Sequence, residues 1–181
     1  TGSAESGYST ETTAIPASGY VPVTINVPGD YPTIQQAINA AKNGDTIQIA
    51  AGIYNECLVL KDGIKLNGSG ARVTTLFGSS GKIVSIPDGI TSQTEITGIT
   101  IDGLGYAAIG IDCQNSQAKI YNNIITNIDG NGIECNFASP TITNNIISDT
   151  ATAVNIYSGN PTVVNNTIDS NEIGINANKS S

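Results

Sequence analysis

The sequence repeats itself near its C-terminus with a spacing of 21 residues. Residues 140–147, PTITNNII, return as PTVVNNTI at 161–168. With gaps that vary by a few residues, the pattern extends back to 119–125 and 95–101. A second apolar run accompanies each copy, at 110–113, 132–135, 153–156 and 174–177. Four structural units can therefore be aligned, and equivalent residues are expected in equivalent environments.

The runs within each unit are short, alternate between apolar and polar residues, and are bounded by Gly, Asn or Asp, as β-strands are. A period of 21 to 24 residues without a helix predicts a β-solenoid of about six or seven coils, all-β in class. A left-handed hexapeptide helix would need an 18-residue coil, and the consensus of a leucine-rich repeat is missing. Because a single coil leaves its apolar row and its edges open, the coils must stack with parallel strands.

Stacking predicts ladders of equivalent residues. We expect two inward ladders, one of Ile111, Ile133, Val154 and Ile175 and one of Cys113, Cys135, Ile156 and Ala177. We expect one outward ladder, of Asp112, Glu134, Asn155 and Asn176. The Asn pairs 122/123, 144/145 and 165/166 fall at bends, where Asn tolerates a left-handed backbone and its amide can bond to the Asn of the next coil.

One helix is expected before the coils. Thr33 and Gln36 form a capping-box pattern, and Gly44 stands where a helix would stop. The pattern predicts a capping helix over 33–43, with coils from about 45 to 177. Residues 1–20, rich in Ser, Thr and Gly, read as a flexible arm, which leaves 21–181 as the parallel β-helix.

This stretch also resembles a known superfamily. YPTIQQAINAAKNGDTIQIAAGIYNECLVLKDGIKLNGSG, followed by SIPDGITSQTEITGITIDG and the NNII coils, is similar to the right-handed parallel β-helix proteins, which include pectate lyases, pectin methylesterases and NosD-like repeat proteins. The resemblance covers about residues 27–177. It matches the capping pattern at Thr33, Ile34, Gln35, Ala37, Ile38, Gly44, Asp45, Ile47, Ile49, Gly52, Tyr54 and Glu56. It implies a right-handed helix of single coils, and it implies no activity, since the shared residues are caps, turns and core.

The charge and composition of the chain restrict the classes of partner that it is expected to bind. With 15 acidic and 7 basic residues the net charge is −8, and six Lys and one Arg spread along the chain form no phosphate-binding patch, so we expect no nucleic-acid partner. No apolar run is long enough to span a membrane. The chain contains no Met and starts at Thr1, so we expect a trimmed piece of an extracellular, cell-surface or periplasmic protein.

The chain contains few residues of the types that catalyse reactions in the enzymes it resembles. The chain has no His, which the hydrolases and epimerases that it resembles use, and Arg72 is its sole arginine. Asp112 and Glu134 should lie one coil apart, roughly 4.8 Å, close enough to hold a Ca²⁺ or to approach the acid and nucleophile of a retaining glycosidase. The favoured alternative is that both keep the sheet soluble. No other metal or cofactor is expected, and no catalytic residue is identified.

Carbohydrate contact has its own candidates. Four candidate residues are those of the outward row, Asp112, Glu134, Asn155 and Asn176. Two more are the outward tyrosines Tyr121 and Tyr157, since exposed aromatic side chains commonly stack on sugar rings. Scattered surface tyrosines are the simpler alternative. Cys113 and Cys135 are expected as buried thiols, with a disulfide between adjacent coils as the alternative, and the state of Cys57 is left open.

Two functions remain open. The first is a non-catalytic extracellular or cell-surface β-helix module, structural or glycan-contacting, with a polysaccharide as partner. The second is the N-terminal part of a polysaccharide lyase or glycoside hydrolase whose catalytic coils lie beyond Ser181. The sequence ends directly after a core strand. We therefore expect one of two situations: the chain is a fragment of a longer solenoid, or its open C-terminal coil is covered by self-association or by a partner.

Overall fold

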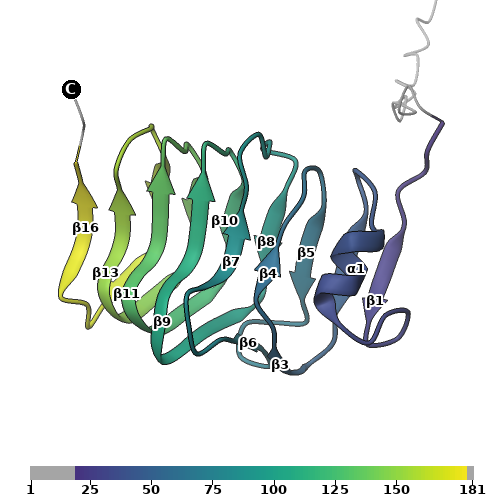
Figure 1. The fold of residues 1–181 in the computed structure, drawn as a ribbon, viewed down its shortest axis with the longest axis horizontal. Helices are drawn as coiled ribbons and strands as arrows, with labels where there is room; N and C mark the ends of the chain where they lie inside the picture. The colour runs from purple at the N-terminus through teal and green to yellow at the C-terminus, as the bar shows by residue number, and fades with distance from the viewer. Residues whose placement is uncertain (1–18, 179–181) are drawn as a thin grey trace, which may run out of the picture.

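The computed structural model describes residues 19–178, and these form a parallel β-solenoid of about seven turns. All strand pairs within it are parallel, and each coil lies on the previous one (Figure 1). The predicted all-β class and right-handed single helix are confirmed. The N-terminal helix and the last strand lie at opposite ends of the stack.

Each coil contributes one strand to a seven-stranded sheet. In spatial order these strands are β1 (Thr24–Val27), β2 (Thr46–Ile49), β5 (Lys65–Gly68), β8 (Glu95–Thr97), β10 (Lys119–Tyr121), β12 (Thr141–Thr143) and β14 (Thr162–Val164). Lys119 pairs with Thr141, and Thr141 with Thr162, so the repeat read from the sequence is the register of this sheet.

A nine-stranded sheet completes the coils. Its main path is β3 (Gly52–Asn55), β6 (Thr74–Phe77), β9 (Thr100–Gln114), β11 (Ile124–Asn136), β13 (Ile146–Ile156) and β15 (Thr167–Asp169). The second halves of β9, β11 and β13 continue into another wall of the solenoid, which β4 (Leu58–Val59), β7 (Lys82–Ile86) and β16 (Ile173–Ala177) join. We call the outer side of this wall the front face, because it faces the viewer in Figure 1.

The two inward ladders form the core as expected, except that Ile156 is only partly buried and that Ile175 and Ala177, on the last coil, are exposed. Ile111, Ile133 and Val154 are in register and fully buried. Ile175 continues this ladder but is 49% exposed, because no described residue lies beyond β16 in the stack. The association predicted at this end stays a prediction.

The bends between the two sheets contain a buried asparagine ladder. Asn123 donates a side-chain N–H to Asn145 Oδ1 at 3.2 Å, and Asn145 donates in the same way to Asn166 at 3.0 Å. Each amide oxygen also accepts a backbone N–H from the preceding coil; for example, Asn123 Oδ1 accepts that of Ile99 at 3.1 Å. The preceding residues, Asn122, Asn144 and Asn165, all have φ of 57°. The predicted role of the Asn pairs is confirmed: the first residue turns the chain and the second joins the coils.

The helix α1 (Ile34–Ala40) lies at the N-terminal end of the stack, where it contacts β1, β2 and β4 (Figure 1). Ile34, Ala37 and Ile38 are buried under it, so the helix covers the first coil with an amphipathic face. None of the helices in the described part of the chain is long and apolar enough to span a membrane.

The helix begins with two kinds of cap. Thr33 Oγ1 accepts the N–H of Gln36 at 3.3 Å, as the capping pattern predicts. The carboxylate of Glu56, on a later coil, accepts the N–H groups of Ile34 and Gln35 at 2.9 and 3.0 Å. This second cap ties the helix to the solenoid, and its negative charge also favours the positive end of the helix dipole.

The helix is shorter than the 33–43 predicted. It ends at Ala40, because Ala41 already has ψ of 150° and the N–H of Lys42 is donated to the Asp45 carboxylate at 2.7 Å. The capping pattern gave no indication that the Asp45 carboxylate would accept this N–H. Because of this hydrogen bond, the helix ends before Gly44.

The solenoid also begins earlier than the sequence indicated. The strand β1 precedes the helix and pairs with β2, whereas the coils were expected to start at about residue 45. Of the predicted 1–20 arm, residues 1–18 lie outside the described residues. Tyr20 is described, and its hydroxyl donates to Asp45 Oδ1 at 2.7 Å.

We predict that Asn145→Ala lowers the free energy of unfolding by about 2–3 kcal/mol, because it leaves the buried N–H of Asn123 without a partner and removes the side-chain hydrogen bond to the carbonyl of Ile120. Urea unfolding would measure the loss. The exposed Asn160 is the matched control, and Asn160→Ala should change stability by less than about 0.5 kcal/mol. Equal losses in both variants would show that the ladder adds no stability.

We predict different reactivities for the three cysteines. Cys113 and Cys135 are register partners, free and buried, whereas Cys57 is free and exposed. The hydrogen bond with the Cys135 thiol, together with burial, raises the pKa of the Cys113 thiol, which further slows its reaction. A thiol reagent should therefore label only Cys57 in the native protein and all three in denaturant. Rapid native labelling of the Cys113 peptide would contradict this packing.

We predict that Asp45 stabilises the fold in a pH-dependent way. Burial by itself would raise the pKa of its carboxyl, but hydrogen bonds from the N–H groups of Lys42 and Val23 and from the Tyr20 hydroxyl outweigh it and lower the pKa. The ionised form is therefore favoured by folding, so its contribution is full above the ordinary Asp pKa and is lost as the pH falls through the lowered one. Asp45→Asn should cost about 1–3 kcal/mol at neutral pH and less at about pH 3, measured by urea unfolding. A constant difference across this range would refute the linkage.

Candidate functional site

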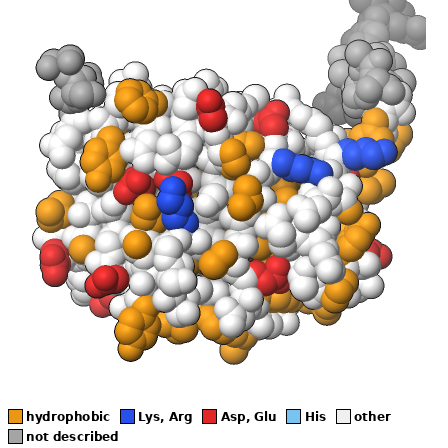
Figure 2. Space-filling model, viewed as in Figure 1, with side chains coloured by type: hydrophobic (Ala, Val, Ile, Leu, Met, Phe, Trp, Pro, Cys, Tyr) orange, Lys and Arg blue, Asp and Glu red, His pale blue; other side chains and the backbone are white. Residues whose placement is uncertain are grey.

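The outward row of the sequence analysis lies on the front face. Ser85, Asp112, Glu134, Asn155 and Asn176 are register partners on successive strands. Figure 2 shows this face as mostly backbone and uncharged side chains, with charged and hydrophobic side chains scattered between them. The structure therefore brings four of the six proposed carbohydrate contacts together.

Asp112 is the least accessible residue of this row. Its side chain is 2% exposed, and Lys82 Nζ lies 2.5 Å from its Oδ2. Gln114 donates to the other carboxylate oxygen at 2.6 Å. A sugar or a cation would reach Asp112 only after Lys82 had moved away.

Glu134 is likewise engaged by its neighbours. Asn131 and Asn136 donate side-chain N–H groups to its two carboxylate oxygens at 2.5 and 2.8 Å. On the next coils Asn176 donates to Asn155 Oδ1 at 3.0 Å. The row is therefore a network whose members already satisfy each other, which explains how two carboxylates tolerate adjacent coils.

The two tyrosines lie on different walls. Tyr157 follows β13 on the front face and is 46% exposed. Tyr121 belongs to β10 of the seven-stranded sheet, where its hydroxyl donates to Glu95 Oε2 at 2.8 Å. The six proposed carbohydrate contacts thus do not form a single site.

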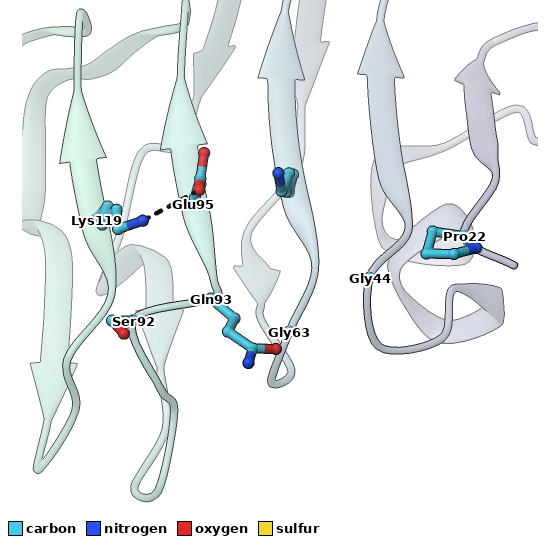
Figure 3. A pocket seen from close by; sticks show the side chains of 8 residues that line it. Pro22, Gly44, Gly63, Ser92, Gln93, Glu95 and Lys119 are labelled. Carbon is cyan, nitrogen blue, oxygen red and sulfur yellow. Dashed lines mark hydrogen bonds and ion pairs between the residues drawn. The ribbon is translucent and has the colours of Figure 1, made fainter. Parts of the chain in front are cut away.

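A hollow of about 430 Å³ lies over the seven-stranded sheet, beside the turns at which strands β2, β5 and β8 start. Lys65, Glu95 and Lys119 line it, and they are register partners on three successive strands. Figure 3 shows Lys119 and Glu95 pointing toward each other, with Gln93 in the turn below them. This arrangement alternates a positive, a negative and a positive charge along the solenoid.

A second hollow of about 250 Å³ continues the first along the strands. It shares Lys65 and Glu95 with it and adds amide and hydroxyl groups, including those of Asn67, Thr97 and Tyr121. We call the two hollows together the sheet trough. The trough is open to solvent along its length, so an extended ligand could lie in it.

Glu95 is the electrostatic centre of the sheet trough. Its Oε1 lies 3.4 Å from Lys119 Nζ. Burial by itself raises the pKa of its carboxyl, but the Tyr121 hydroxyl and the charges of Lys65 and Lys119 outweigh this and lower the pKa. Burial and the hydrogen bond to Glu95 raise the pKa of Tyr121. At neutral pH the site therefore holds an ionised carboxylate and a phenol as hydrogen-bond donor.

The sequence analysis missed Lys65, Glu95 and Lys119. A signal for them was present, because each is the first residue of an aligned strand and alternates outward with Asn67, Thr97 or Tyr121. The outward row predicted from the sequence contains only positions from the second strand of each coil. Tyr121 was therefore predicted without Glu95, its hydrogen-bond partner.

No group of three or more His, Cys, Asp or Glu side chains that could hold a metal occurs in residues 19–178. Asp112 and Glu134, the proposed Ca²⁺ pair, do lie on adjacent strands. Lys82 already neutralises one of the two, which leaves little net charge for a cation.

Comparisons with known proteins support the fold. No curated protein sequence matches the chain significantly. Among solved structures the chain is similar to ORF18 of Geobacillus virus E2, with a TM-score of 0.65 and 18% sequence identity over 75% of this chain. The match covers 33% of the viral protein, so the chain spans about a third of its length. This similarity shows a shared fold and no more.

A family model described as "Right handed beta helix region" matches residues 38–181. The match includes every coil from β2 onward and therefore most of the chain. This agrees with the parallel strands, the asparagine ladder at the bends and the resemblance found in the capping segment. The chain belongs to the right-handed β-helix family.

Proposed function

We propose that this β-helix is a non-catalytic module of an extracytoplasmic protein and that it contacts an extended polysaccharide in the sheet trough. The observation that carries the proposal is the trough itself, an open concavity lined by charged, amide and hydroxyl groups around Tyr121. Small apolar ligands favour enclosed pockets, whereas a long hydroxyl-rich chain needs an open surface with many hydrogen-bonding groups.

The groups in the trough suit a sugar chain. The ammonium group of Lys65 forms no hydrogen bond or ion pair within residues 19–178, so it is available to hydroxyl or carboxylate oxygens of a ligand. Glu95 offers acceptor lone pairs, and Asn67 and Thr97 add groups that both donate and accept. Tyr121 contributes an aromatic surface beside these polar groups.

The geometry favours binding over turnover. Glu95 is held ionised by Tyr121 and two lysines, whereas a general acid needs a raised pKa. The close pair Asp112 and Glu134 lies on another face and is engaged with Lys82 and side-chain amides. These contacts support a surface that recognises a polymer and leaves it intact.

The lining is also rigid, which favours recognition. Lys65, Glu95 and Lys119 stand on paired strands whose register is set by backbone hydrogen bonds on both sides. A ligand therefore meets side chains whose backbones are already ordered, and little additional backbone entropy is lost on binding.

We predict that a glycan array identifies at least one polysaccharide ligand, and that Tyr121→Ala weakens its binding by about 2- to 10-fold in calorimetric titrations, because it removes an aromatic contact of about 0.5–1.5 kcal/mol. Lys65→Gln should weaken binding as well. Tyr106, which is 73% exposed and lies outside the trough, is the matched control, and Tyr106→Ala should leave the affinity unchanged.

Two results would contradict the proposal. If Tyr157→Ala or Asn155→Ala abolishes binding while Tyr121→Ala does not, the glycan lies on the front face. If the chain cleaves polygalacturonate, alginate or pectin, with or without Ca²⁺, and Asp112→Ala or Glu134→Ala stops the reaction, the protein is a carbohydrate-active enzyme.

A further inference from the structure

A separate hollow lies at the bend between the two sheets, away from the trough residues. It has a volume of about 510 Å³ and is lined by the turn around Arg72 on one side and by Asn122, Asn144, Ile124 and Ile146 on the other. No role was assigned to it from the sequence. Three features, a cation, a row of amides and an apolar floor, converge there.

The turn that presents Arg72 is tied to the solenoid. The carbonyl of Gly70 accepts the N–H groups of Val73 and Thr74 at 3.0 and 2.9 Å, which closes the turn. The hydroxyl of Thr100 donates to the carbonyl of Ala71, which fixes the turn against the next coil. Arg72 therefore projects from an ordered backbone.

Arg72 itself is unpaired. It is the sole arginine of the chain, and within residues 19–178 it forms no salt bridge and no hydrogen bond. The residues that line this hollow include no acid among those described. In a protein of net charge −8 this is a local positive site without an internal counter-charge.

The amides of this hollow are also free. Asn122 and Asn144 both have φ of 57° and are exposed, and neither side chain bonds to a described residue. Their neighbours Asn123 and Asn145 are buried and fully engaged in the ladder. The turn geometry thus divides each Asn pair into one amide that joins the coils and one that faces solvent.

The floor of the hollow is apolar. Ile124 and Ile146 are register partners on β11 and β13, and both point outward. Ile146 is 38% exposed. Val73, in the turn, adds a further apolar side chain to the lining. An apolar body placed on this floor would remove these side chains from water.

We propose that this hollow binds an organic carboxylate, with the carboxylate on the Arg72 guanidinium, the apolar body on Ile124 and Ile146, and the amides of Asn122 and Asn144 beside it. A guanidinium presents two parallel N–H donors that match a carboxylate. The single unpaired cation balances one negative charge. A phosphate monoester carries nearly two, and the described lining contains no second cation to balance it.

Hexanoate is the test ligand, with acetate and hexan-1-ol as fragments that lack the apolar body or the charge. Titrations of isotopically labelled full-length chain, followed by NMR, should show hexanoate shifting the signals of Ile124, Ile146 and the Arg72 turn. Hexanoate should bind more tightly than either fragment. Arg72→Gln should weaken hexanoate at least about tenfold, because it removes a charge-assisted pair of hydrogen bonds.

Further variants separate charge from shape. Arg72→Lys keeps the charge without the fork and should lose part of the affinity. Ile146→Ser should bring hexanoate close to acetate. Lys61→Gln, which removes a charge outside the hollow, should have no effect. Polysaccharide binding in the sheet trough should persist in Arg72→Gln, so a failure here is distinguishable from a failure of the proposed function.

Four outcomes would overturn the proposal. The first is that hexanoate binds nowhere at millimolar concentrations, and the second is that it binds equally well to Arg72→Gln. Hexan-1-ol could match hexanoate, which would make the site purely apolar. Hexyl phosphate could bind more tightly than hexanoate, which would assign the hollow to phosphate esters instead.

Discussion

The structure depends on the parallel hydrogen bonding of each coil to the coils on both sides. Most of its strands have three to five residues, too few to bury an apolar face or to satisfy their backbone groups alone. Stacking supplies both requirements at once: strand pairs satisfy the backbone, and rows such as Ile111, Ile133 and Val154 become a continuous core. A coil at either end of the stack has a neighbouring coil on one side only, and α1 covers one of these two ends.

Stacking also places like residues beside like, which suits some side chains better than others. Apolar rows gain contacts, and amides gain partners, as the Asn123–Asn145–Asn166 ladder shows. Carboxylates on adjacent coils would repel each other, and the front face resolves this by placing Lys82 on Asp112 and two amides on Glu134. In the sheet trough Glu95 lies between two lysines instead. One rule of packing thus explains both the core and the charge pattern of the outer faces.

The same regularity determines where ligands can bind. Where neighbouring side chains satisfy one another, as in the Asp112 row, the surface is closed by its own hydrogen bonds. Where they do not, as at Lys65 and at Arg72, a charged group remains available beside a hollow. The proposed glycan and carboxylate sites are two such positions on different walls, each on backbone that the stack already holds in place.

The sequence by itself determined the solenoid, the register of its last four coils, the inward ladders and the role of the Asn pairs. It could do so because a coil repeat leaves a local, periodic pattern, and each of these features follows from spacing along the chain. Only the tertiary structure decided where the cap ends, which strand comes first and which polar groups are free. The end of α1 depends on Asp45 accepting the N–H of Lys42, and its second N-terminal cap comes from Glu56. The accessibility of Asp112 depends on Lys82, which lies 30 residues earlier in the sequence. These contacts join residues of different types at positions that do not repeat from coil to coil. A repeat of similar residues in the sequence therefore cannot predict them.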